Sequence, residues 1–203
     1  MQMGTHHTPF DLSQPAVRER AHAARNRRLV LEAAKRLIAE RGVECVTMDD
    51  IAREAGVGKG TVYRRFGDRA GLAIALLDER ERELQDLVLR GPPPLGPGAP
   101  PAERIAAFLE AQVDVIDPVA DLFAAAERGG PGFRSRVHAS HRLHVEILLR
   151  GTCPDEHVSF LADALLAPIS ADLYLHLRRE RGMSVEEVKA GLRALVKSIV
   201  ARQ

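Results

Sequence analysis

The chain has 203 residues, and its 29 Lys and Arg nearly balance its 28 Asp and Glu, which leaves a formal net charge of +1. This length suits one domain or two small ones with a buried core, and the composition is that of a soluble globular protein. The sequence has no apolar run long enough to span a membrane. Its only two cysteines, Cys45 and Cys153, argue against a disulfide scaffold, and we expect them to be core thiols of a cytoplasmic protein.

The first segment has the composition of a disordered basic arm, which we place at residues 1–24. Residues 1–15 contain two histidines and two prolines but no hydrophobic stretch that would serve as a secretory signal. An arginine-rich run follows, made of Arg18, Arg20, Arg25, Arg27 and Arg28. Residues 18–77 together carry a net charge of about +5, and the rest of the chain offsets it with about −4.

Helical periodicity begins after the arm. A first apolar stripe ends at Gly42 and consists of Leu29, Ala33, Leu37 and Ile38. A second helix is predicted to begin near Met48, because Thr47 can cap its first turn and Asp50, three residues further on, completes a capping box.

A glycine turn separates this second helix from a third one. Gly56 supplies the backbone freedom that a sharp turn requires, and Val62 and Phe66, four residues apart, direct the third helix back to a small core. The residues left to face outward are Lys59, Thr61, Tyr63, Arg64 and Arg65. Two short helices joined in this way, with basic and hydroxyl groups outward on the second, predict a DNA-binding helix-turn-helix.

The remaining chain reads as helix throughout, so we predict an all-α fold. Asp68 can cap a connecting helix that carries Leu72, Leu76, Leu84 and Val88, and the proline-rich residues 91–101 form a loop. Three further helices are expected at residues 102–116, 119–127 and 134–149, with a glycine-rich break at 129–132.

Two long apolar helices, at residues 158–181 and 185–200, end the chain. Each apolar stripe is broader than one neighbouring helix would cover, which favours a four-helix interface with a second copy of the chain; the alternative is two core helices of a monomer. The expected interface residues are Leu161, Leu165, Ile169, Leu173, Leu192, Leu195, Val196 and Ile199.

Residues 27–72 resemble the DNA-binding domain of TetR-type transcriptional regulators nearly end to end. The matching features are the first helix to Gly42, the segment from Thr47 to Ala52, the turn at Gly56, residues 60–66 and the start of the fourth helix at Asp68. The resemblance implies a homodimeric helical repressor that binds a double-stranded DNA operator and, through its C-terminal half, a small-molecule effector. It implies a helix-turn-helix domain at 25–72 and a ligand-binding and dimerisation domain at 73–203.

The resemblance also assigns roles to residues of this chain. It makes Thr47, Tyr63 and Arg69 phosphate contacts and makes Lys59, Gly60, Thr61 and Arg64 contacts of the recognition helix. Arg64 or Lys59 can donate to guanine, and Arg65 and the arm residues Arg27 and Arg28 can add further contacts; for each cation the alternative is a solvated surface charge. Two departures from the family pattern, Gly58 in place of a hydroxyl residue and Arg69 in place of lysine, bear on which DNA sequence is preferred.

An effector cavity is expected among the helices after the proline-rich loop. Its predicted lining residues are Phe108, Gln112, Phe123, Phe133, His141 and Tyr174, an apolar wall with few polar anchors. No cofactor, catalytic residue or metal ligand is predicted. The alternatives are a metal-responsive regulator, because His138, His141 and His144 recur every three residues, and a helical enzyme or ligand carrier.

Overall fold

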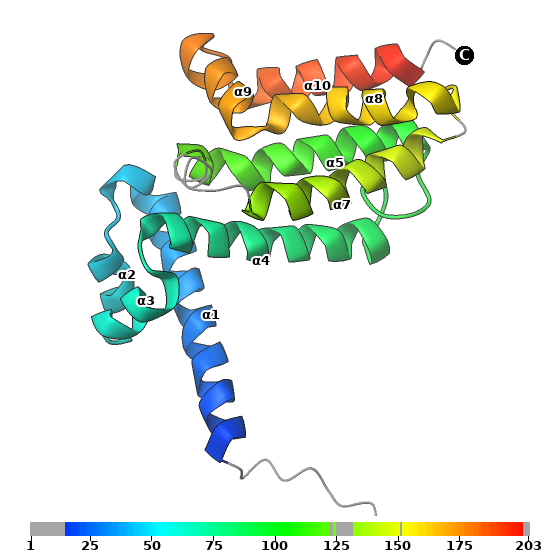
Figure 1. The fold of residues 1–203 in the computed structure, drawn as a ribbon. Coiled ribbons are helices and arrows are strands. Elements are labelled where there is room, and N and C mark those ends of the chain that lie inside the picture. Colours follow the sequence, from blue (N-terminus) through cyan, green and yellow to red (C-terminus); the bar gives the residue numbers. More distant parts are fainter. Residues whose placement is uncertain (1–14, 122–123, 125–131, 151, 201–203) are drawn as a thin grey trace, which may run out of the picture.

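The computed structural model describes residues 15–121, 124, 132–150 and 152–200, and for residues 15–17 and 132–137 it describes the backbone alone. Over these residues the fold is helical, as predicted (Figure 1). The α-helices are α1 (Pro15–Arg41), α2 (Met48–Glu54), α3 (Lys59–Phe66), α4 (Arg69–Arg90), α5 (Pro101–Ile116), α7 (Gly132–Leu149), α8 (Asp155–Leu166), α9 (Ala171–Leu175) and α10 (Val185–Val200). Short 3-10 turns are η1 (Val43–Cys45), η2 (Asp117–Val119) and η3 (Ala167–Ile169), and a π-helical turn, η4 (His176–Glu180), follows α9.

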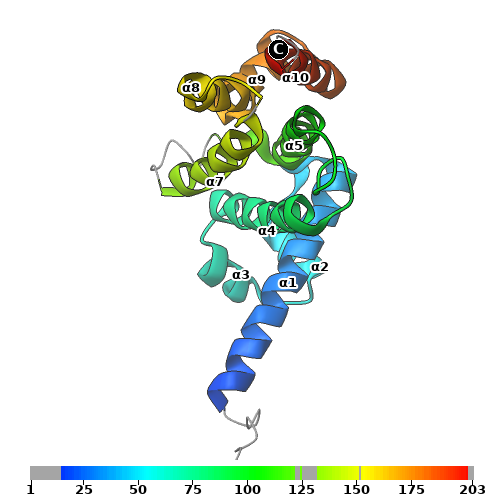
Figure 2. The ribbon, with the colours of Figure 1, turned by 90° about the vertical axis from the view of Figure 1, so that its right-hand side faces the viewer.

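The helices stack in layers along the connecting helix α4 (Figures 1 and 2). Helices α1, α2 and α3 gather at the N-terminal end of α4, α5 and α7 cover α4, and α8 and α10 cover α5 and α7. The loop between α4 and α5 lies at the opposite end from α2 and α3. This arrangement places the helix-turn-helix at one end of the molecule.

Two hydrophobic cores meet on α4. The first core joins α1, α2 and α3 to Leu72 and Leu76 of α4. The second core joins Leu77, Leu84 and Val88 of α4 to the helices that follow. Because Leu76 and Leu77 are neighbours in sequence but belong to different cores, α4 is the element through which the two parts of the molecule are joined.

The capping and turn predictions for the N-terminal part are confirmed. Thr47 and Asp50 form a capping box at the start of α2, and Asp68 accepts a hydrogen bond from the backbone N–H of Gly71 at the start of α4. Gly42 and Gly56 adopt φ angles of 76° and 65°, the left-handed region that glycine tolerates without strain. The start of α2, the start of α4 and the turns at Gly42 and Gly56 therefore have the causes that the sequence indicates.

The first helix begins earlier than predicted. Helix α1 starts at Pro15, so residues 15–24, which we assigned to a disordered arm, are helical, and residues 1–14 lie outside the described part. Proline suits the first turn of a helix, and the alanines and arginines that follow favour helix strongly. The N-terminal half of α1 projects beyond α2 and α3 as a basic helical extension (Figure 1).

The predicted helix at 158–181 is wrong as a single element. Pro168 interrupts it, so that α8 ends at Leu166, η3 follows, and α9 starts at Ala171. A proline inside a helix removes one hydrogen bond and clashes with the preceding turn, a signal that the apolar spacing concealed. The predictions for α5 and α7 agree within two residues, and α10 matches. The predicted helix at 119–127 and the break at 129–132 fall largely outside the described residues.

No single helix in the described part of the chain is long and apolar enough to cross a membrane. The bent pair Asp155–Ile169 and Ala171–Glu180 passes the same test on length and composition alone, with a bend of 48°. Leu165, Leu166 and Tyr174 of this pair are buried in the second core, as expected for core helices.

Candidate DNA-binding surface and effector site

The two helices of the helix-turn-helix bury one face and expose the other. Ile51 and Ala52 of α2 and Val62 and Phe66 of α3 are buried in the first core. On the opposite face of α3, Tyr63, Arg64 and Arg65 are exposed, and Tyr63 keeps 47% of its surface accessible. The apolar spacing thus orients α3 as predicted.

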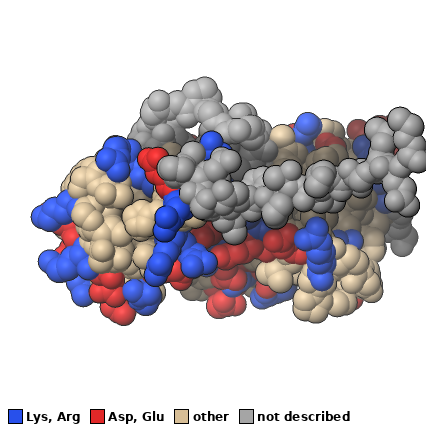
Figure 3. Space-filling model, turned by 90° about the horizontal axis from the view of Figure 1, so that it is seen from below, with Lys and Arg blue, Asp and Glu red and all other residues tan. Residues whose placement is uncertain are grey.

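The exposed end of the molecule is rich in positive charge. Lys and Arg side chains gather around the part that carries α2 and α3, while acidic side chains are prominent along the middle of the same view (Figure 3). Gly60, at the start of α3, has no atom within 4 Å of the position that a Cβ would occupy, so this part of the helix offers an open surface. A polyanionic duplex can approach such a surface closely.

Three of the predicted DNA-contacting cations are held by the protein itself. Lys59 forms an ion pair with Asp49 that joins α3 to α2. Nη2 of Arg69 donates a hydrogen bond of 2.6 Å to the carbonyl oxygen of Val43, and Nη2 of Arg27 lies 3.5 Å from the carbonyl oxygen of Ala75. Arg69 and Arg27 therefore tie α4 to η1 and to α1.

Three other cations are exposed and unengaged. Within the described part of the chain, Arg28, Arg64 and Arg65 have no hydrogen-bond or ion-pair partner. Thr61 is half-buried, and Thr47 is exposed but uses its hydroxyl in the capping box. Thr47 Oγ1 accepts from the backbone N–H of Asp50 at 3.1 Å and donates to the Asp50 carboxylate at 2.6 Å.

The cysteine prediction is half right. Cys45 is exposed in η1, because the short turn after Gly42 leaves it outside the first core, so it is not a core thiol. Cys153 is half-buried and packs against the second core, and its thiol donates to the carbonyl oxygen of Leu149 at 3.6 Å. Burial, aided by the charge of Asp155, raises the pKa of the Cys153 thiol, which disfavours the thiolate.

In the C-terminal part, three polar side chains from α4, α5 and α7 meet in the second core. Nε2 of His141 lies 2.7 Å from a carboxylate oxygen of Glu81 and 2.8 Å from Nε2 of Gln112. Glu81 and Gln112 are 7% and 4% exposed, so these groups are almost fully withdrawn from water. We call Glu81, Gln112 and His141 the polar cluster.

The hydrogen-bond demands of the polar cluster compete. One ring nitrogen of His141 cannot donate to Glu81 and accept from the Gln112 amide at the same time. The Gln112 amide can instead be turned so that its oxygen accepts from His141. Its NH₂ group then points away from Glu81, and the 3.4 Å hydrogen bond from Gln112 to the Glu81 carboxylate is lost. A buried cluster that cannot satisfy all its donors and acceptors is a place where a polar ligand would find partners.

Aromatic and basic groups border the polar cluster. The ring of Phe108 packs edge-on against His141 and His144, with ring centroids 5.4 and 4.8 Å apart. Burial, followed by the charges of Arg104 and His141, lowers the pKa of His144 to about 4. Nε2 of His144 and Nε of Arg104 are buried without a hydrogen-bond partner among the described residues.

The structure brings together only part of the predicted effector site. Phe108, Gln112 and His141 meet as expected, whereas Tyr174 lies elsewhere in the second core and donates to Asp117 at 2.6 Å. Phe123 and the side chain of Phe133 lie outside the described part. Glu81 was missed, although its place four residues after Leu77 and three before Leu84 puts it on the apolar stripe of α4, where an acid is unusual.

The three histidines of α7 have different surroundings. His138 is exposed and lies 3.4 Å from Asp163, His141 faces Glu81, and His144 packs on Phe108. Among the described residues, no group of three or more His, Cys, Asp or Glu side chains is placed to hold a metal ion.

Three of the eight predicted dimer residues face the interior of their own chain. Leu165, Leu192 and Val196 are at most 2% exposed in the second core, and this part of the prediction is wrong because α8 packs on α7, α10 packs on α5, and α8 and α10 contact each other. Leu161, Ile169 and Ile199 are half-buried against the same core. The residues that remain exposed are Leu173, Leu195 and, unpredicted, Phe160, which is 76% exposed.

Comparison with known proteins agrees with this geometry. Residues 30–76 match the family model described as bacterial regulatory proteins, tetR family. The HTH-type transcriptional regulator BetI of Rhizobium meliloti (strain 1021) is 28% identical over 158 residues, which cover 73% of this chain and 76% of that protein. An HTH-type transcriptional regulator of Staphylococcus aureus (strain USA300) is 45% identical over 58 residues, but these cover only 29% of this chain and 31% of that protein.

Solved structures share the fold beyond the helix-turn-helix. A transcriptional regulator from Rhodococcus sp. Rha1 superposes with a TM-score of 0.64 at 19% identity, covering 86% of this chain and 96% of that one. A transcriptional regulator from Saccharomonospora viridis, solved in complex with choline, superposes with a TM-score of 0.61 at 23% identity, covering 86% and 96%. The similarity therefore extends over both cores.

Proposed function

This chain is a TetR-family transcriptional regulator with a DNA-binding helix-turn-helix, and we propose that it acts as a homodimeric repressor which a small-molecule effector releases from its operator. The observation that carries the proposal is the orientation of α3, whose apolar side is anchored in the first core while Tyr63, Arg64 and Arg65 face outward. Two such helices, related by a dimer axis, would enter successive major grooves about 34–36 Å apart.

We assign the outward residues to two roles. Arg64, which is free of protein partners among the described residues, reads base edges, and Gly60 and Thr61 let the helix approach the groove. Tyr63 and Thr47 contact phosphates, with Arg28 and Arg65 as further cations. Lys59 and Arg69 must exchange their present partners, Asp49 and Val43, or share them, before they can contact DNA.

The polar cluster is the proposed effector site. The carboxylate of Glu81 favours an effector with a positive charge or a hydrogen-bond donor, and the ring of Phe108 offers an apolar wall. Choline, the ligand of the Saccharomonospora viridis regulator, has such a charge and is the first compound to test. Because Glu81 lies on α4, an effector that displaces Gln112 from it acts directly on the helix that joins the two cores.

The proposed dimer surface is the exposed part of α8, α9 and α10. Phe160, Leu173 and Leu195 are the large apolar side chains left accessible there. Large exposed apolar side chains are typical of surfaces that a partner covers.

We propose that the two cores act as separate domains with their boundary in α4, near the predicted position 72/73.

Binding to the DNA upstream of the protein's own gene tests the proposal. In a mobility-shift titration at several salt concentrations, the full chain should form a specific, salt-sensitive complex. Arg64→Ala should weaken specific binding by about 1–3 kcal/mol, whereas Arg90→Ala, at an exposed arginine at the far end of α4, is the matched control and should bind normally. Equal binding to any polyanion would contradict a role as a sequence-specific regulator.

The effector half of the proposal needs a separate readout. Choline and a panel of small amines are added to the preformed complex, and release of DNA is followed by fluorescence anisotropy. Glu81→Gln should keep DNA binding and lose the response, since it removes the carboxylate but preserves the shape of the side chain. A response that is unchanged in this variant would place the effector elsewhere.

A further inference from the structure

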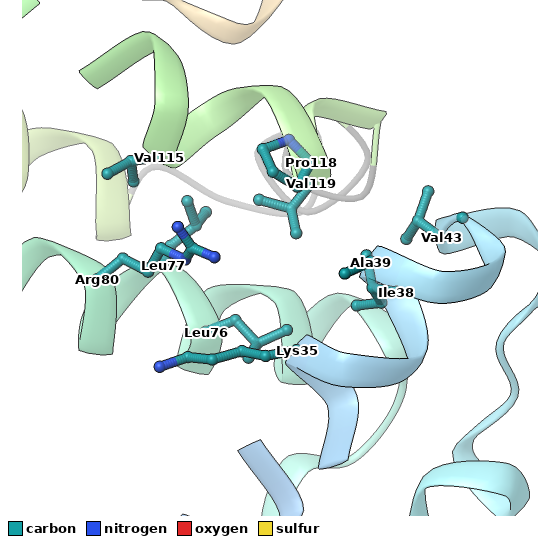
Figure 4. Close-up of a pocket in the computed structure, with 11 residues that line it drawn as sticks. Lys35, Ile38, Ala39, Val43, Leu76, Leu77, Arg80, Val115, Pro118 and Val119 are labelled. Carbon is teal, nitrogen blue, oxygen red and sulfur yellow. The ribbon is translucent and has the colours of Figure 1, made fainter. Parts of the chain in front are cut away.

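A second cavity, separate from the polar cluster, lies where the two cores meet (Figure 4). Its volume is about 230 Å³, and its walls are mostly apolar. Ile38 and Val43 line it from the end of α1 and the start of η1, Leu76 and Leu77 from α4, and Val115 and Val119 from the end of α5 and from η2. Both parts of the molecule therefore line the cavity, which is partly open to solvent.

Among the residues that the structure describes, two charged side chains line this cavity, Lys35 and Arg80, and they differ in their partners. The Lys35 ammonium lies 3.3 Å from Glu83 and 3.6 Å from both Glu79 and Glu32. Burial alone would lower the pKa of Lys35, but the hydrogen bond to Glu83 and the surrounding carboxylates outweigh it and raise the pKa. Lys35 is thus fully compensated by acids of the protein.

Arg80 has no such compensation among the described residues. Over the residues that the structure describes, no carboxylate lies within 4.0 Å of its guanidinium and no hydrogen bond engages it. Its side chain is half-buried, and in Figure 4 it extends from α4 toward the side of the cavity that Val115 lines. Within the described part of the chain, the cavity therefore combines mostly apolar walls with one cation that has no counterion.

We propose that this cavity binds a small amphipathic carboxylate, with the carboxylate on Arg80 and the apolar tail between Ile38 and Val119. A guanidinium presents two parallel N–H donors that match the two oxygens of a carboxylate, and it stays protonated when the carboxylate is bound. An apolar cavity of about 150 Å³ holds one benzene molecule, so the larger volume here suits an acid of about ten non-hydrogen atoms. Octanoate and 3-phenylpropanoate have this size and chemistry.

A ligand in this cavity would contact both cores at once. Val43 lines the cavity, and its carbonyl oxygen accepts the hydrogen bond of Arg69 at the start of α4. Leu76 belongs to the first core and Leu77 to the second. The site thus lies on the joint between the helix-turn-helix and the rest of the chain, and it uses neither the polar cluster nor the outward face of α3.

Calorimetric titration of the full chain with octanoate tests the site without DNA, so the result is independent of the proposed repressor function. Octanamide, which has the same shape without the charge, should bind at least about tenfold more weakly. Arg80→Gln should weaken octanoate binding by a similar factor, whereas Arg82→Gln, at an exposed arginine of the same helix outside the cavity, should leave it unchanged.

A filled cavity provides the second test. Ala39 lines the cavity and is exposed, so Ala39→Trp can enter it without disturbing either core, and this variant should lose octanoate binding while its thermal unfolding stays close to that of the wild type. Three outcomes would overturn the proposal: no heat of octanoate binding to the wild type at millimolar concentration, equal affinity for octanamide, or undiminished affinity in the Arg80→Gln or Ala39→Trp protein.

Discussion

Replacing Thr47 by alanine separates two functions that this residue combines. Thr47 caps α2, a helix of only seven residues, by accepting from the backbone N–H of Asp50, while the Asp50 carboxylate accepts from the backbone N–H of Thr47 at 3.2 Å. Alanine removes the hydroxyl acceptor, so the backbone N–H of Asp50 loses its hydrogen-bond partner. We expect the free energy of unfolding to fall by about 1 kcal/mol, and at most about 2 kcal/mol, in urea denaturation.

The loss of the cap alone cannot account for a large loss of DNA affinity. A domain with a free energy of unfolding of about 5 kcal/mol or more remains over about 99% folded after such a change. Asp50→Ala breaks the same capping box without removing the hydroxyl, so it serves as the matched control. If Thr47 also contacts a phosphate, Thr47→Ala should weaken binding to all DNA sequences by roughly fivefold more than Asp50→Ala does.

Thr47→Ser completes the series, because serine caps as well as threonine and retains the hydroxyl. It should restore both stability and DNA affinity. The capping argument is refuted if Thr47→Ala unfolds at the same urea concentration as the wild type. The phosphate assignment is refuted if Thr47→Ala and Asp50→Ala weaken DNA binding equally.

Three further predictions concern the C-terminal part. Because burial lowers the pKa of His144 from 6.5 to about 4, the unfolded chain binds a proton in this pH window that the folded chain does not, so the free energy of unfolding should decrease as the pH falls from 6.5 toward 4. His144→Leu should remove on the order of 1 kcal/mol of this decrease, after allowance for partial solvent access, in denaturation at pH 7 and pH 4.5; identical pH profiles would disprove the assignment. Tyr174→Phe removes the 2.6 Å hydrogen bond that Tyr174, which is 1% exposed, donates to Asp117. The free energy of unfolding should fall by about 1–2 kcal/mol in thermal unfolding, and an unchanged value would show that this hydrogen bond does not stabilise the fold. Leu195→Lys, on the exposed face of α10, should shift the chain from dimer to monomer in light scattering without loss of helix content, and an unchanged dimer would place the interface elsewhere.

Local signals in the sequence were sufficient where a single residue decides the backbone. Thr47 and Asp68 cap their helices, and Gly42 and Gly56 take left-handed conformations, as their positions indicate. The outward face of α3 also followed from spacing, since Val62 and Phe66 leave only one side of the helix free. Pro168 is an equally local signal, but the apolar spacing continues through the break that its missing N–H causes, so spacing alone predicts one helix where the structure has two.

Other features depend on which helices lie next to each other. Spacing shows that Leu165, Leu192 and Leu195 lie on apolar stripes, but it does not show which of them their own chain covers. Leu165 and Leu192 are buried where α8 packs on α7 and α10 packs on α5, whereas Leu195 stays exposed. In the same way, Glu81 was visible as an acid on an apolar stripe, yet its partners come from α5 and α7. Sequence spacing reports the faces of one helix and carries no information on its neighbours.

The amino-acid sequence by itself determined the helical class, the helix-turn-helix and the orientation of its recognition helix, because capping, glycine turns and apolar periodicity act within a few residues. Only the tertiary structure decided that Arg27, Lys59 and Arg69 are held by the protein and that Glu81, Gln112 and His141 meet. It also decided that Arg80, which has no counterion among the residues described, faces a cavity between the two cores. Each of these depends on contacts between segments distant in the chain, which only the packing of whole helices against one another establishes.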